Sequence, residues 1–153
     1  MRRVLWLGTR MITTIVVLTF VMQAASVNET AEGKYSSYVD GKRWDFIVSR
    51  QDIENSPRWR EVDVSPPLPP RVAIQSARFL LWQLIKDART WRLASVKLQP
   101  IYRPGDWIYL VEFAPPPPRT HGGLINTMTV VVLMNGRAIV PVSSKWPPEF
   151  KPR

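Results

Sequence analysis

The clearest pattern of apolar and polar positions in the chain lies between Pro70 and Ala88. Apolar residues recur there at i, i+4, i+7, i+8, i+11, i+12 and i+15, which places them along one side of a helix at 100° per residue. The spacing therefore predicts an amphipathic helix over 70–88 whose apolar stripe faces a sheet. The stripe consists of Ala73, Ala77, Leu80, Leu81, Leu84, Ile85 and Ala88.

Two large apolar residues of this helix, Phe79 and Trp82, do not belong to the stripe. On the helical wheel they fall on the opposite side, where water is expected. Two explanations are open: Trp44, Phe46 or Trp59 folds back and covers both rings, or the rings form an exposed docking face for another protein. Phe79 and Trp82 are therefore the candidate interaction face of the protein.

Alternation and apolar runs after the helix predict an antiparallel sheet over 91–142. Residues 107–113, WIYLVEF, are apolar on both faces and are expected to form a central strand. The four prolines 115–118 cannot pair in a strand ladder and predict a break in the sheet. Residues 91–101 alternate, and the set expected to face mostly inward is Arg92, Ala94, Val96 and Leu98.

The stretch MTVVVLMNGRAIVPV, residues 128–142, predicts a hairpin. Asn135-Gly136 is suited to the positive φ angles of a type I′ turn, and β-branched residues flank it. Arg137 beside the turn is the only titratable residue of this stretch. The stretch therefore predicts a structural role and lacks the side chains of a catalytic site.

This order of elements predicts an α+β fold in which one amphipathic helix packs on a four-stranded antiparallel meander. An extended Pro-rich strap, defined as residues 42–69, precedes the helix, and its first part, KRWDFIVSR, has the pattern of a strand. Residues 27–41 are polar, lack periodicity and are expected to be a flexible lead segment. A single domain over 42–153 then comprises strap 42–69, helix 70–88, sheet 91–142 and tail 143–153.

The N-terminal 26 residues have the composition of an export signal. Three arginines within the first ten residues are followed by the apolar core Met11 to Met22, and small residues at 24–26 offer a cleavage site. The core is too short to cross a bilayer of ~30 Å at 1.5 Å per residue. We therefore expect export to the periplasm or the cell exterior, with cleavage after Ser26.

An uncleaved anchor over Val4–Met22 is the alternative, and it would provide the expected contact of the protein with a membrane. The chain has no Cys, which excludes thiol catalysis, thiolate metal sites and disulfides. Its only histidine, His121, lies in the segment PPPPRTHGG, and one His does not make a two-His metal site. We therefore expect neither a metal nor a cofactor.

The net charge of the chain is +9, from 21 Lys and Arg and 12 Asp and Glu. Removal of the three signal arginines leaves 18 basic residues and a net charge of +6. The sequence shows no basic run interleaved with aromatic residues, so no nucleic-acid partner is expected. Moderate basicity in an exported protein favours an envelope protein or an anionic envelope polymer as partner.

A catalytic role has limited support from the residue types present. Glu112 and His121 are the candidate polar groups of the alternative function, a small pocket-containing ligand-binding protein or hydrolase. A phosphate loop, nucleophile elbow or metal motif is absent from the sequence. Four carboxylates of the strap alternate with arginines and are explained more simply as a solvated stretch: Asp52, Glu54, Glu61 and Asp63.

Residues 71–141 resemble small exported PepSY-like and cystatin-like domains, and also exported bacterial proteins of no assigned function. The resemblance rests on the order RVAIQSARFLLWQLI, WRLASVKLQPI, WIYLVEF and VVVLMNGRAIVP, with Trp107-x-Tyr109 and Asn135-Gly136. It implies a helix on an antiparallel sheet, and PepSY members are associated with regulating exported enzymes and with envelope binding. It supplies no catalytic residue. We therefore expect a noncatalytic exported binding or regulatory module of the cell envelope.

Overall fold

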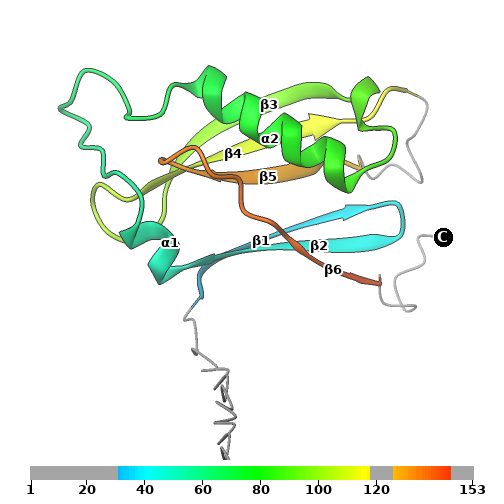
Figure 1. The fold of residues 1–153 in the computed structure, drawn as a ribbon, viewed down its shortest axis with the longest axis horizontal. Coiled ribbons are helices and arrows are strands. Elements are labelled where there is room, and N and C mark those ends of the chain that lie inside the picture. The colour runs from blue at the N-terminus through cyan, green and yellow to red at the C-terminus, as the bar shows by residue number, and fades with distance from the viewer. Residues whose placement is uncertain (1–30, 118–125, 146–153) are drawn as a thin grey trace, which may run out of the picture.

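The computed structural model describes residues 31–117 and 126–145, which form an α+β fold with two antiparallel three-stranded sheets (Figure 1). Sheet A contains β1 (Ala31–Val39), β2 (Lys42–Ser49) and β6 (Val142–Lys145). Sheet B contains β3 (Arg92–Pro100), β4 (Trp107–Ala114) and β5 (Met128–Leu133). The helices are α1 (Arg50–Glu54), α2 (Pro70–Leu84) and the 3-10 turn η1 (Ala88–Thr90). Across the molecule the strands follow in the order β3, β4, β5, β1, β2, β6.

Sheet A begins with a tight hairpin between β1 and β2. Asp40 and Gly41 have φ angles of 51° and 69°, and Val39 pairs with Lys42 across them. Two consecutive positive φ angles are the geometry of a two-residue type I′ turn, whose twist matches that of the paired strands. Alternate residues of β2 are buried on the inner face of the sheet: Trp44, Phe46 and Val48.

Strand β1 also joins sheet A to sheet B. The Oγ of Ser37, which is buried, accepts a hydrogen bond from the backbone N–H of Thr129 on β5 at 2.9 Å. The prediction of a flexible lead segment over 27–41 is therefore wrong for β1, because its polar residues bond to two neighbouring strands instead of water. The buried apolar residues of both sheets and of α2 form one hydrophobic core.

Strand β4 lies at the centre of sheet B, which confirms the prediction from its apolar sequence. The expected inward set of β3 is only partly correct. Val96 and Leu98 are half-buried, whereas Arg92 and Ala94 are exposed. The physical reason is an irregularity in the β3–β4 pairing between Leu93 and Ser95, which breaks the alternation, so that Leu93 instead of Arg92 lies opposite the buried Phe113.

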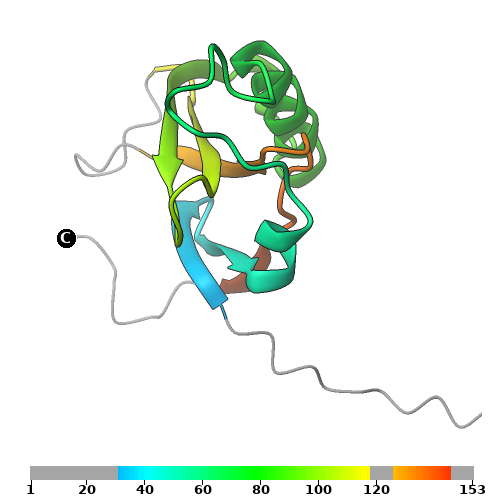
Figure 2. The same cartoon turned by 90° about the vertical axis from the view of Figure 1, so that its left-hand side faces the viewer.

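Helix α2 covers one face of sheet B, where it contacts β4 and β5 (Figures 1 and 2). Pro70 occupies the first helical turn, where its fixed φ and missing N–H cost nothing. The helix ends at Leu84 instead of Ala88, because Ile85 takes an extended backbone with φ −119° and ψ 120° and remains buried. The buried residues of α2 confirm the predicted stripe: Ala73, Ala77, Leu80 and Leu81.

The chain reverses after β5 in a tight turn over residues 134–136. The Gly136 N–H donates to the Leu133 carbonyl, and the Leu133 N–H donates to the Arg137 carbonyl, both at 2.9 Å. Gly136 has a φ of 86°, but Asn135 is not among the described residues with positive φ. The predicted hairpin turn is present, but the type I′ assignment is wrong. The geometry is that of a longer turn closed by a glycine bulge.

The strand expected after this turn is reduced to an isolated bridge between Val132 and Ala138. Pro141 has no N–H with which to continue a ladder, and the chain crosses to sheet A, where β6 pairs with β2. The prediction of a four-stranded meander is therefore wrong, whereas the α+β class and the antiparallel pairing are confirmed. The expected tail 143–153 begins inside β6, and its residues after 145 lie outside the described part of the chain.

The segment expected as a strap, residues 42–69, contains β2, α1 and a loop over 55–69. Helix α1 begins with a capping box: the Ser49 Oγ accepts from the Asp52 N–H at 3.2 Å, and the Asp52 carboxylate accepts from the Ser49 N–H at 3.0 Å. The strand predicted at its start is confirmed as β2. Only the loop 55–69 has the extended character that the prolines predicted.

Candidate interaction face on helix α2

Phe79 and Trp82 lie on the side of α2 that faces away from the sheet. Their side chains are 63% and 46% exposed, respectively. The helical wheel therefore predicted their orientation correctly. A single exposed apolar side chain is ordinary on a protein surface, but two large rings one turn apart form a patch that is open to a partner.

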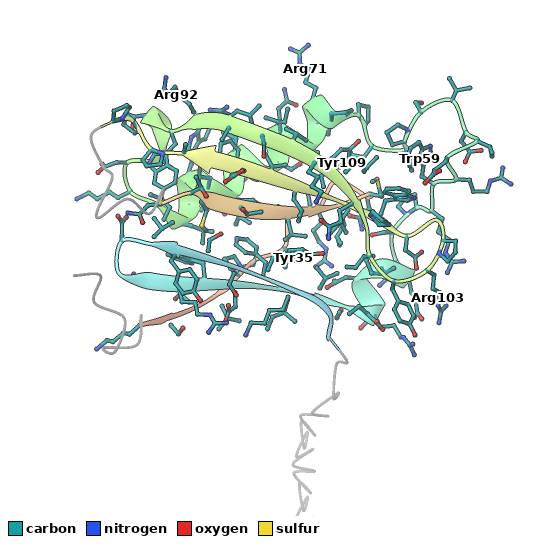
Figure 3. All side chains as sticks on the ribbon, turned by 180° about the vertical axis from the view of Figure 1, so that it is seen from behind. Tyr35, Trp59, Arg71, Arg92, Arg103 and Tyr109 are labelled. Carbon is teal, nitrogen blue, oxygen red and sulfur yellow. The ribbon has the colours of Figure 1, made fainter. Side chains whose placement is uncertain are left out.

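The covering of these rings by the strap was the alternative explanation, and it is wrong. Trp44 and Phe46 are buried in the core beneath sheet A. Trp59 instead packs edge-on against Trp107 of β4, with ring centroids 5.2 Å apart. The Trp107 Nε1–H donates to the Trp59 carbonyl at 3.0 Å, so the loop 55–69 is fixed at the end of sheet B (Figure 3).

A shallow hollow of about 270 Å³ adjoins Phe79. It lies between α2 and the segment after the β5 turn, where Val140 is 72% exposed. The reduced pairing after Gly136 produces this hollow, because Ala138 and Val140 are not covered by a further strand. Its lining is largely apolar and consists of Ser76, Phe79, Leu80, Gln83, Gly136, Ala138 and Val140.

Cationic side chains lie against aromatic rings on this side of the molecule. The guanidinium of Arg89 lies over the Trp82 ring at 6.0 Å from its centroid. Arg78, on α2, lies over the Phe113 ring at 5.3 Å. Such contacts hold a cation near the ring face by its quadrupole. The apolar patch of α2 is therefore bordered by positive charge.

Glu112, a candidate polar group of a ligand pocket, lies on β4 opposite Ser95. It is half-buried, and its carboxylate accepts a hydrogen bond from the Ser95 hydroxyl at 3.0 Å. Glu112 does not line the hollow beside Phe79. The other candidate, His121, lies outside the described residues. Glu112 thus has a partner within the sheet that explains its position.

Two of the four carboxylates of the strap have structural partners. Asp52 caps α1 and forms an ion pair with Arg137, which ties α1 to the turn after β5. Asp63 accepts hydrogen bonds from the backbone and side chain of Arg60, and these lower the pKa of Asp63. The remaining two are exposed: Glu54 and Glu61.

A charged cluster that the sequence did not indicate lies where α1 meets the turn between β3 and β4. Asp106 is buried, and its carboxylate lies 3.1 Å from the Arg58 Nε. Arg50 pairs with Glu32 at the same distance. The hollow between these groups measures about 10 Å³, which accommodates at most about one water molecule. The cluster therefore joins the loop 55–69 to the sheets and leaves no room for a larger ligand.

Within the described residues, no group of three or more His, Cys, Asp or Glu side chains is placed to hold a metal ion. Over residues 31–117 and 126–145, no helix has the length and apolar content needed to span a bilayer. Comparison of the chain with protein-family models, curated proteins and solved structures found no match. The resemblance of residues 71–141 to PepSY-like and cystatin-like domains therefore stays a prediction.

Proposed function

We propose that the protein is a noncatalytic exported binding or regulatory module of the cell envelope, which binds its partner through Phe79 and Trp82. The observation that supports this is the exposure of both rings, 63% and 46%, on a helix whose other side is fully packed. Aromatic side chains provide much of the binding energy in protein interfaces, and they are seldom left open in pairs.

The hollow beside Phe79 adds to this support. Val140 and Ala138 extend the apolar surface from α2 to the segment that leaves sheet B. A partner that covers Phe79 would therefore also contact this segment. Helix and segment are fixed relative to one another, because α2 packs on β5 and the turn at 134–136 continues from β5. The face is thus preformed, which lowers the entropic cost of binding.

Export is the part of the proposal that rests on the sequence of residues 1–26, which lie outside the described residues. It is tested by N-terminal sequencing of the protein recovered from the envelope or medium of an expressing cell. We expect the recovered chain to begin at Val27. Recovery of the uncleaved chain from the cell interior would contradict export.

Binding is tested by affinity capture from detergent-solubilised envelope extract. The baits are the wild type, the Phe79→Ser/Trp82→Ser variant and a matched Val62→Ser/Val64→Ser variant, whose valines are exposed on the loop 55–69. We expect a captured protein that the first variant loses and the second retains. Each bait is first compared in thermal unfolding, where we expect little change because all four side chains are at least 46% exposed.

If the Phe79→Ser/Trp82→Ser variant folds and captures the same proteins as the wild type, the face proposed here is wrong. The unpaired edge of β3 would then be the next surface to test, because edge strands offer free backbone groups to a partner. If none of the three baits captures a protein and none binds lipid, the binding function itself is contradicted.

A further inference from the structure

Positive charge is concentrated in one stretch of the chain. Between Val64 and Gly105 the sequence has seven basic residues and one acidic residue, Asp87. Residues 31–63, in contrast, have six basic and seven acidic residues. The seven basic residues of the first stretch lie on α2, η1, β3 and the adjoining turns: Arg71, Arg78, Lys86, Arg89, Arg92, Lys97 and Arg103.

Several carboxylates of sheet A and of the loop 55–69 are paired within their own region. Asp45 lies 3.1 Å from Lys34 and 2.8 Å from Arg43. Burial alone would raise the pKa of Asp45, but hydrogen bonds from Ser36, Lys34 and Arg43 outweigh it and lower the pKa, so the carboxylate is ionised at neutral pH. The other ion pairs between described residues are Arg50–Glu32, Arg58–Asp106, Arg60–Asp63 and Arg137–Asp52.

None of the seven basic residues takes part in these ion pairs between described residues. Six of the seven are exposed, and Arg78 is half-buried over Phe113. Figure 3 shows Arg71 and Arg92 projecting from the side of the molecule that carries α2 and β3, away from sheet A. This side therefore has a net positive field, whereas sheet A is close to neutral.

The two exposed aromatic residues of α2 lie within this positive region. Phe79 and Trp82 project from the outer surface of α2, between Arg71 near its start and Lys86 just after its end. Arg89 lies over the Trp82 ring. The surface thus combines two side chains suited to the boundary between water and lipid with cations suited to phosphate.

We propose that this surface docks on an anionic lipid membrane, with Phe79 and Trp82 entering the headgroup region and Arg71, Lys86 and Arg89 contacting lipid phosphates. This inference rests on the proposed function, because it names the chemistry of the partner for the same α2 face. It differs from the sequence expectation, which placed membrane contact at an uncleaved signal. Here the folded domain itself provides the contact.

The distribution of the charges favours a lipid surface over a pocket in a protein. The cations of this surface lie on α2, just after its end and on η1, on either side of the aromatic rings, and the rings project from a helix instead of lining a groove. A broad anionic surface complements such an arrangement, because each cation near it gains electrostatic energy without a specific partner. Residues on the other side, such as Lys42 and Lys145, form a cross-strand pair in sheet A and would face away from the lipid.

The test is co-sedimentation with vesicles of phosphatidylcholine alone and of phosphatidylcholine mixed with phosphatidylglycerol. Residues 27–153 are used, since they contain every described strand and helix and the whole hydrophobic core. The full chain is measured in parallel. In the full chain the apolar stretch Met11 to Met22 is the same in all variants. Differences in vesicle binding among the full-length variants are therefore due to the substituted residues.

Two variants remove the proposed contacts, and each has a matched control. The apolar variant Phe79→Ser/Trp82→Ser is compared with Val62→Ser/Val64→Ser. The charge variant Arg71→Gln/Lys86→Gln is compared with Lys42→Gln/Lys145→Gln, and this control removes the same amount of positive charge from sheet A. We expect wild type to bind only the anionic vesicles and to be released by salt. Each α2 variant should reduce partitioning roughly tenfold or more, whereas both controls should bind as wild type does.

The lipid proposal is overturned if wild type does not bind anionic vesicles, if it binds neutral vesicles equally well, or if a control loses as much binding as its matched α2 variant. Protein capture that depends on Phe79 and Trp82 without vesicle binding would also overturn it, but would leave the proposed binding function intact. Failure of both experiments would contradict both proposals, so the two can be distinguished.

Discussion

Tyr109 and Leu68 are joined by a buried hydrogen bond, in which the phenolic hydroxyl donates to the backbone carbonyl at 2.8 Å. Tyr109 lies in the central strand β4, and Leu68 lies just before α2. Their exposed fractions are 2% and 7%. The bond therefore fixes the entry of α2 relative to sheet B, and with it the position of the α2 face.

The Tyr109→Phe variant should lower the free energy of unfolding by about 1–2 kcal/mol, because it leaves the buried Leu68 carbonyl without its donor. Urea unfolding followed by circular dichroism measures the change. Tyr102→Phe is the control. Tyr102 is 55% exposed, so water can hydrogen-bond to the groups that lose its hydroxyl. Equal effects of the two substitutions would show that the bond to Leu68 contributes nothing specific.

The contribution of Tyr109 should depend on pH in the alkaline range. Burial raises the pKa of the Tyr109 hydroxyl above its ordinary value of 10.0. The stabilisation is therefore fully present below the unfolded-state pKa and is lost as the pH rises through the folded-state pKa. We expect the stability difference between wild type and Tyr109→Phe to shrink above about pH 10 in unfolding curves. A difference that grows with pH would contradict this sign.

The Ser37→Ala variant should weaken the junction between the two sheets. It leaves the Thr129 N–H without its acceptor, and an unsatisfied buried donor costs about 1–3 kcal/mol. Hydrogen exchange of the Thr129 amide should accelerate, and the unfolding midpoint should fall. Ser143→Ala, at an exposed position of β6, is the control and should change neither quantity. Unchanged exchange at Thr129 in Ser37→Ala would contradict the proposed role of this bond.

The Trp59→Ala variant should release the loop 55–69 without opening the core. The substitution removes the ring contact of Trp59 with Trp107, whereas the backbone N–H of residue 59, which donates to the Gly105 carbonyl at 2.9 Å, is retained. We expect a loss of roughly 2 kcal/mol, less than for a fully buried tryptophan because Trp59 is half-buried. Limited proteolysis should show new cleavage within 55–69. Resistance equal to that of wild type would mean that the loop is held by other contacts.

The sequence predicted the elements whose apolar residues repeat with a clear period. The stripe of α2 and the apolar run of β4 were sufficient to place both. Strand β1 was missed because its polar residues, such as Ser37, have partners on other strands that no local pattern reveals. A usable signal was nevertheless present: Asp40-Gly41 is a type I′ dipeptide of the same kind as Asn135-Gly136, and it is Asp40-Gly41 that forms this turn.

The outer face of α2 was predictable in part. The helical wheel placed Phe79 and Trp82 on the outer side, but whether another segment covers them depends on tertiary contacts. Trp59 was one of the residues considered as a cover for them, but it packs against Trp107 instead. The net charge of the whole chain did not reveal that positive charge is concentrated beside α2. To recognise this surface, one must know which carboxylates form ion pairs within sheet A.

The pairing of β2 with β6 has a consequence for the order in which the chain folds. Because synthesis proceeds from the N-terminus, the β1–β2 hairpin is available long before residues 142–145. Until they arrive, one edge of β2 at Lys42–Asp45 is unpaired, and an open strand edge promotes aggregation. Sheet A is thus completed last, and a nascent chain ending before β6 is the state most dependent on a chaperone.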